Sequence, residues 1–205
     1  MYMPEAFHED DLELLQTFIR EHSFGAMVTV QDGLPVANHY PFLLDAQRGP
    51  QGTLFAHMAR ANSQWRSLCE TQEVLVIFQG PHNYVSPSWY LHDAPGNVPT
   101  WNYAVVHAYG QPRLIEDMQE LYDLLHSSVE TFEAPFEQPW KLHEAEEYAQ
   151  KMKSIVGFAI QITRLEGKFK LSQNRPKVDR ERVIAALTKQ DSPVADLMIA
   201  RREKF

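Results

Sequence analysis

The dipeptide Asp32-Gly33 separates two strand-like runs, 24–31 (FGAMVTVQ) and 34–44 (LPVANHYPFLL). An Asp-Gly pair between alternating apolar residues is a strong hairpin signal, because both turn residues must adopt positive φ. The chain is therefore predicted to form two adjacent antiparallel strands here. Pro41 has no backbone N–H to give to a neighbouring strand, so it predicts an edge position or a bulge.

The remaining pattern alternates strand-like runs with helices and is joined mostly by short turns. Strands are predicted at 53–59, 73–80, 100–115 and 155–172, with a broken extended stretch at 83–90. Helices are predicted at 8–22, 62–70, 116–132, 143–154, 179–189 and 192–205. Antiparallel strands accept tight connections and barrels remove exposed edges. We therefore predict a β-rich α+β fold, a closed or partly closed antiparallel barrel with peripheral helices.

Length, composition and charge limit the number of domains and the kinds of partner that are expected for the chain. Its 205 residues favour a single domain, 1–205, with a helical tail from about 178 to 205. No apolar run approaches the roughly 18 residues of a membrane span, and the first residues lack a secretory signal, so we expect a cytoplasmic protein. The net charge of −8 gives little general affinity for nucleic acid, so DNA binding would need a local basic patch.

Several chemical classes lack support in the sequence. The single cysteine, Cys69, excludes an internal disulfide, and its place near the end of a predicted helix predicts a buried, unreactive thiol. The nine histidines show no H-x-x-x-H or H-E-x-x-H spacing, so no metal site is predicted. There is no G-x-G-x-x-G, P-loop or G-x-S-x-G motif. No catalytic residue is assigned.

Residues 57–65 (HMARANSQW) combine groups that suit a phosphorylated ligand. A strand end that leads into a helix exposes unpaired backbone N–H groups, and Arg60 adds a planar, permanently charged fork. Trp65 offers a flat apolar surface or a plug for the core. The alternative is an ordinary helix cap, formed by Asn62 or Ser63, beside a solvated arginine and a buried tryptophan.

Three further clusters carry candidate residues. The mixture in 84–90 (YVSPSWY) suits a pocket or interface with a few fixed hydroxyls, or a packed turn. In 98–110 (VPTWNYAVVHAYG), alternation places Thr100 and Asn102 on one face and the aromatic residues with His107 on the other. The only basic stretch, 168–183, could face phosphate, contact DNA or form a solvated surface, and no helix-turn-helix precedes it.

Taken in order, the motifs VANHYPFLL, FAHMARANSQW, VIFQGPHNYVSPSWY, VPTWNYAVVHAYG and KLSQNRP closely resemble the PaiB-like family of FMN-binding negative transcriptional regulators. The resemblance covers almost the whole chain. It implies a split β-barrel like that of pyridoxamine-phosphate oxidases, and a homodimer with FMN at the subunit interface. It also implies a cofactor-binding set of His57, Arg60, Asn62, Trp65, Ser86, Thr100, Asn102, Lys170 and Gln173.

Within this set, the resemblance gives Arg60 the FMN phosphate, with Asn62 hydrogen-bonding it and Trp65 behind the site. Three functions remain open. The first, which the resemblance favours, is a flavin-dependent oxidoreductase or flavin sensor with a role in negative transcriptional regulation. The second is a DNA-binding repressor without enzymatic activity. The third is a haem-binding or haem-degrading split barrel, with His57 or His107 as the candidate ligand.

Overall fold

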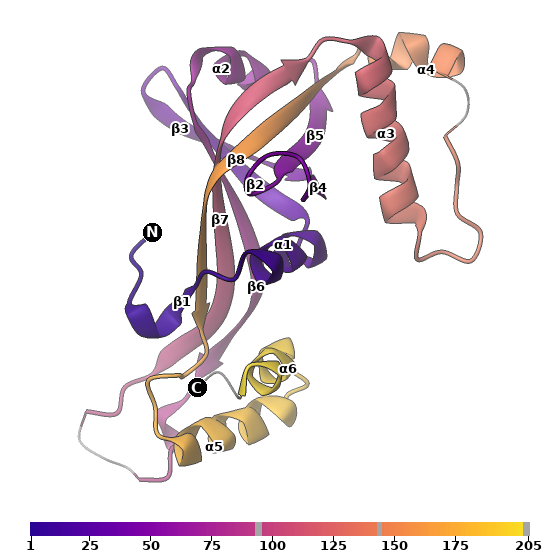
Figure 1. Cartoon of the computed structure of the whole chain (residues 1–205). Helices are drawn as coiled ribbons and strands as arrows, with labels where there is room; N and C mark the ends of the chain where they lie inside the picture. Colours follow the sequence, from indigo (N-terminus) through magenta and orange to yellow (C-terminus); the bar gives the residue numbers. More distant parts are fainter. Residues whose placement is uncertain (93–95, 143–144, 203–205) are drawn as a thin grey trace. The chain divides into compact units, whose positions relative to one another are not determined.

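The computed structural model describes residues 1–92, 96–142 and 145–202. Its elements follow one another along the chain as shown in Figure 1. They are η1 (Glu5–Phe7), β1 (His8–Glu9), α1 (Leu12–Glu21), β2 (Phe24–Gln31), β3 (Leu34–Pro41), β4 (Leu43–Asp45), β5 (Thr53–Ala59), α2 (Gln64–Glu70), β6 (Val74–Val85), η2 (Pro87–Trp89), β7 (Thr100–Ile115), α3 (Met118–Glu133), α4 (Ala145–Met152), β8 (Ile155–Lys170), α5 (Lys177–Thr188) and α6 (Pro193–Ala200).

The strands form an antiparallel sheet with peripheral helices, which confirms the predicted fold class. Within the described residues, eight strands pair in the order β3-β2-β6-β7-β8-β5-β4, with β1 added to β8. The hairpin prediction is also confirmed, because Gln31 pairs with Leu34 and the two turn residues have φ of 51° and 77°. Pro41 ends β3, a strand at the edge of this order, where a missing N–H costs no ladder hydrogen bond.

Two predictions about local structure are wrong. The first helix begins at Leu12 and not at His8, because His8 and Glu9 form a short strand that pairs with Lys168 and Gly167. Cys69 is exposed, because it lies on the solvent side of α2. The helix predicted from residue 143 starts partly outside the described residues, and α4 covers Ala145–Met152.

The chain divides into two compact units, and β6, β7 and β8 each supply residues to both. Unit 1 comprises Met1–Asp11, Gln79–Val106 and Glu166–Phe205, and unit 2 comprises Leu12–Phe78 and His107–Leu165. Unit 2 has an aromatic core in which Phe42 meets Phe78 and Phe158 edge-on, with ring centroids 5.6 and 6.2 Å apart. Such edge-to-face pairs add to the free energy of burial.

One glycine of unit 2 is required by close packing of neighbouring strands. A Cβ atom at Gly110 of β7 would lie 2.5 Å from the carbonyl oxygen of Gln161 on β8. Because that neighbour is backbone, it has no freedom to move aside. A side chain at this position would therefore force β7 and β8 apart.

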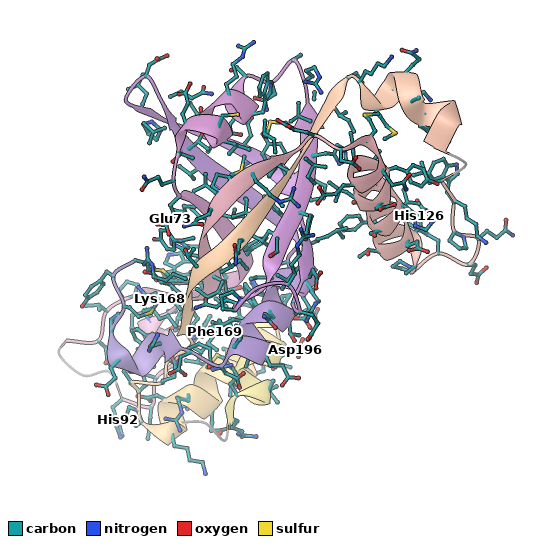
Figure 2. All side chains as sticks on the ribbon, turned by 45° about the horizontal axis from the view of Figure 1, so that its top comes forward. Glu73, His92, His126, Lys168, Phe169 and Asp196 are labelled. Carbon is teal, nitrogen blue, oxygen red and sulfur yellow. The ribbon has the colours of Figure 1, made fainter. Side chains whose placement is uncertain are left out.

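In unit 1, α5 and α6 lie beside one another (Figure 1), and α5 also contacts η2. Consecutive residues of β8, Lys168 and Phe169, both labelled in Figure 2, have different surroundings: the ammonium group lies over Tyr103, whereas the Phe169 ring lies 4.6 Å below the guanidinium of Arg201. Arg201, at the end of α6, forms a buried ion pair with Glu9 of β1. Burial lowers the pKa of Arg201, which reflects the cost of removing this cation from water.

Candidate functional site

Arg60 joins the loop after β5 to the start of β8. Its Nε donates to the carbonyl of Lys153 at 2.8 Å and its Nη2 to that of Ile155 at 2.9 Å. Its backbone N–H donates to Ser154 at 2.8 Å. Among the described residues Nη1 makes no hydrogen bond. The guanidinium is therefore fixed by two carbonyls while one of its N–H₂ groups stays open to a ligand.

The side chain of Asn62 is engaged inside unit 2. Of the two predicted caps, Ser63 occupies the N-cap position of α2 and its side chain makes no cap hydrogen bond, whereas Asn62 Oδ1 accepts the backbone N–H of Gln64, the first residue of α2, at 3.0 Å. Asn62 Nδ2 donates to the hydroxyl of Tyr40 at 3.0 Å. Both ends of the carboxamide thus fix the shape of the loop against β3.

Gln64 is the centre of this arrangement, and sequence analysis did not identify it. Its side chain is 1% exposed, yet it makes five polar contacts with two strands. Its Nε2 donates to Met27 O, Thr29 Oγ1 and Val36 O at 3.1–3.2 Å, and its Oε1 accepts from Tyr40 OH at 2.7 Å and Asn38 Nδ2 at 3.0 Å. A buried amide satisfied in this way locks α2 to the β2–β3 hairpin.

Trp65 and the charges around it complete the loop. The indole Nε1 donates to the carbonyl of Arg60 at 3.1 Å, and the guanidinium of Arg66 lies 5.3 Å from the indole ring. Burial lowers the pKa of His57, which favours the neutral imidazole. No carboxylate side chain occurs in 57–66, and the segment carries two arginines, Arg60 and Arg66. These side chains suit an anionic group such as the phosphate of FMN.

The low pKa of His57 predicts a pH dependence of stability. Because burial lowers this pKa, and also that of His22, the unfolded chain binds more protons than the folded chain just below pH 6.5. The free energy of unfolding should therefore fall as the pH drops from about 7 towards 5. Urea titrations across this range should show a smaller fall in His57→Gln. The exposed His92→Gln is the matched control, and an unchanged slope in His57→Gln would contradict the assignment.

In unit 1, Lys170 and Thr100 lie together. The ammonium of Lys170 donates to Thr100 Oγ1 at 2.5 Å and to the carbonyl of Trp101 at 2.6 Å. Burial, together with the positive charges of Lys168 and Arg175, lowers the pKa of Lys170. This half-buried cation holds the start of β7 to the end of β8.

The other three predicted residues of unit 1 bond to their own surroundings. Asn102 is fully buried, and its carboxamide exchanges hydrogen bonds of 2.9 and 3.1 Å with the hydroxyl of Ser172. Gln173 accepts the backbone N–H of Leu171 at 2.6 Å and donates to Phe169. Ser86 caps η2 and lies 2.8 Å from the hydroxyl of Ser88. Of the nine predicted residues, these three, Lys170 and Thr100 belong to unit 1, and His57, Arg60, Asn62 and Trp65 to unit 2.

Several cationic side chains of the basic stretch 168–183 donate hydrogen bonds to other residues of unit 1. Lys168 donates to the carbonyl of Tyr2 at 3.0 Å, Arg175 to Asn97 Oδ1 at 3.1 Å and Arg180 to the carbonyl of Arg175 at 3.2 Å. Such internal bonds leave fewer groups to face a DNA backbone. Within the described residues, no three His, Cys, Asp or Glu side chains gather as a metal site.

Residues 1–164 match the sequence model of a family described as "Putative FMN-binding domain". A curated relative, the protease synthase and sporulation protein PAI 2 of Bacillus subtilis, is 37% identical over 200 residues, which cover 97% of this chain and 94% of the relative. The chain belongs to the PaiB-like FMN-binding family. This membership assigns FMN to the PaiB-like chain as its cofactor.

Solved structures agree with the fold of the PaiB-like chain. The flavocytochrome Anf3 from Azotobacter vinelandii has a TM-score of 0.62 at 12% identity and covers 82% of this chain and 72% of its own. The FAD and haem binding protein from Mycobacterium smegmatis has a TM-score of 0.61 at 15% identity and covers 87% and 79%. At these identities the likeness concerns the fold alone, and the split β-barrel is confirmed. In the described part of the chain, every helix is too short or too polar to span a membrane.

Proposed function

We propose that this PaiB-like chain binds the FMN phosphate at the loop 57–65 and works as a flavin-dependent oxidoreductase. The observation that carries the proposal is the open Nη1 group of Arg60, on a guanidinium already fixed by Lys153 and Ile155. A pre-positioned arginine loses little conformational freedom when it binds an anion, and charge-assisted hydrogen bonds to phosphate are strong. The absence of acidic side chains in 57–66 supports the same site.

The residues of the loop divide the work. Arg60 bonds the phosphate, and Trp65, tied to the Arg60 carbonyl, provides an apolar wall. Asn62 acts through the shape of the loop, because its own carboxamide is bonded to Tyr40 and Gln64. Bound FMN supplies the electron-transfer chemistry, and the protein supplies binding, orientation and local electrostatics. No strong proton-transfer pair is needed in such a site.

The predicted cofactor residues of unit 1 are proposed to form a second group, which contacts the flavin away from the phosphate. The cation of Lys170 and the hydroxyl of Thr100 offer donors suited to ring or ribityl oxygens, and burial lowers the pKa of Lys170. We also propose a cytoplasmic homodimer with a role in negative transcriptional regulation, which the family resemblance supports. Light scattering after size-exclusion chromatography tests the dimer.

The test of the phosphate site is an FMN titration followed by the visible spectrum of the bound flavin. Wild-type protein should bind one FMN per chain, and Arg60→Ala should weaken binding about 10- to 100-fold, because one charge-assisted hydrogen bond contributes about 1.5–3 kcal/mol. Arg20→Ala, which removes an exposed arginine elsewhere in unit 2, should leave the affinity within about twofold.

A second pair of measurements separates binding from folding. Because Arg60 also bonds two carbonyls, the melting temperature of the Arg60→Ala apoprotein is measured first, and Arg60→Lys keeps the charge without the bonded fork. If a folded Arg60→Ala protein binds FMN as tightly as wild type, the phosphate lies elsewhere. If steady-state assays with nicotinamide donors and quinone acceptors show flavin reduction but no turnover, the oxidoreductase assignment fails while FMN binding stands.

A further inference from the structure

A groove of about 460 Å³ in unit 1 is lined by none of the nine predicted cofactor residues. It lies between η2 and α5 and is lined by Ser88, Trp89, Arg182, Ala185, Ala186 and Lys189, with Gln190 at its end. Its size is within the range of small-molecule pockets. Its chemistry comes from one face of α5 and from the short turn that carries the serine and the tryptophan.

The α5 side of the groove follows helical spacing. Arg182, Ala185, Ala186 and Lys189 are related by steps of three, four and seven residues, so they share one face of the helix. The two alanines make a low floor, and the two cations lie at its ends, about 10 Å apart by the helix rise. An extended apolar body would fit between them.

The charge of the groove is of one sign. No carboxylate lines it, and the acids of α5 nearest to Arg182 are engaged elsewhere: Asp179 accepts the backbone N–H of Leu91 at 2.8 Å, and Glu181 pairs with Arg202. Asp191, just beyond α5, is not among the lining residues either. Neither Arg182 nor Lys189 is therefore paired with a described carboxylate in the groove.

Arg182 is held in place through its Nε atom, which leaves the two terminal nitrogens for a ligand. Its Nε donates to the carbonyl of Trp89 at 2.7 Å. Among the described residues neither terminal nitrogen has an acceptor, so the Nη1 and Nη2 pair presents a fork suited to phosphate. Ser88 and Trp89 line the same groove from η2, and they bring a hydroxyl-bearing and an indole side chain to it.

We propose that this groove binds a nucleoside monophosphate. Its phosphate is held by the Arg182 fork and the Ser88 hydroxyl, and its base lies on the alanine floor against Trp89. Lys189 adds a second positive charge at the far end. Because the site uses both a phosphate and a flat ring, inorganic phosphate or a free nucleoside should bind more weakly than the mononucleotide. The site is independent of the FMN loop, which belongs to unit 2.

Calorimetric titration of the full chain with AMP tests the proposal, with adenosine and inorganic phosphate as partial ligands. AMP should bind saturably at millimolar concentration or below, at the same affinity with and without saturating FMN. Arg182→Gln should weaken AMP binding about tenfold or more, since it removes a charged donor pair. Lys177→Gln, the same charge change at the first residue of the same helix but outside the groove, should change the affinity less than about twofold.

Four outcomes would overturn the site. They are no saturable AMP binding, equal binding of adenosine, equal losses in Lys177→Gln and Arg182→Gln, and displacement of AMP by FMN. Because Arg182 also bonds Trp89, Lys189→Gln provides a second groove variant. Among the described residues the Lys189 side chain makes no hydrogen bond, so this variant should weaken AMP binding without disturbing the fold. A 20-base-pair duplex that binds through Arg182 when AMP does not would assign the groove to a nucleic-acid backbone and reject the mononucleotide.

Discussion

Replacement of Gln64 by leucine should lower the free energy of unfolding by about 3 kcal/mol or more, because it strands several buried polar groups at once. Thr29 Oγ1 and two strand carbonyls each lose a hydrogen bond, and the Tyr40 hydroxyl loses its acceptor while it keeps the bond from Asn62. Each unsatisfied buried group costs about 1–3 kcal/mol, and partial relaxation keeps the total below the sum. The loss falls on the joint between α2 and the β2–β3 hairpin.

Chemical denaturation of the apoprotein measures this effect without interference from a cofactor. Gln119→Leu is the matched control, since Gln119 is an exposed residue of α3 whose side chain, among the described residues, bonds only to Asp123. It should change stability by no more than about 0.5 kcal/mol. Equal effects of the two substitutions on the free energy of unfolding would mean that the buried hydrogen bonds of Gln64 add no stability. If Gln64→Leu folds, its FMN affinity should also fall, because Asn62 and the loop lose their fixed position.

Truncation of Glu9 to alanine is the second substitution with a large expected effect. It leaves the guanidinium of Arg201, which is 7% exposed, buried without its counter-charge. Breaking a buried ion pair in this way costs about 3–5 kcal/mol. Thermal unfolding should therefore show a clear loss of stability, in a substitution far along the sequence from any predicted cofactor residue.

The double variant Glu9→Leu with Arg201→Met distinguishes the charge from the packing. Removing both ions removes both desolvation costs, so the double variant should be much more stable than Glu9→Ala and close to wild type. A double variant as unstable as Glu9→Ala would show that the side chains matter by shape and not by charge. Glu5→Ala, an exposed acid of the same terminal segment, is the control.

The features that sequence predicted correctly are those fixed by local chemistry. Asp32 and Gly33 define a tight turn whatever the rest of the chain does, so the hairpin and its register follow directly. The first helix was misjudged at its start because His8 and Glu9 find their partners about 160 residues away, on β8. The exposure of Cys69 likewise depends on which face α2 turns to the sheet, which short-range pattern does not determine.

The sequence indicates the charged residues of the candidate site but not the hydrogen bonds that hold them in place. Arg60 stands out in the sequence as a cation after a strand, but the carbonyls that fix it come from Lys153 and Ile155. Gln64 carries no signal of its own, because a glutamine at a helix start is ordinarily a surface residue. Its neighbours in the polar run 62–64 gave the one available hint: three consecutive amide or hydroxyl side chains before a tryptophan exceed what a simple cap needs.

The sharing of β6, β7 and β8 between the two units limits how the protein can be dissected. Unit 1 is assembled from three separated stretches, so no continuous fragment encodes it. A fragment ending at residue 164, where the family match stops, would lack the end of β8 together with α5 and α6, and with them the buried apolar side chains of Phe169, Leu171 and Leu187. It would also leave the buried Glu9 without Arg201. Such a fragment should aggregate unless residues 165–205 are supplied as a separate peptide, which makes the chain a natural candidate for fragment complementation.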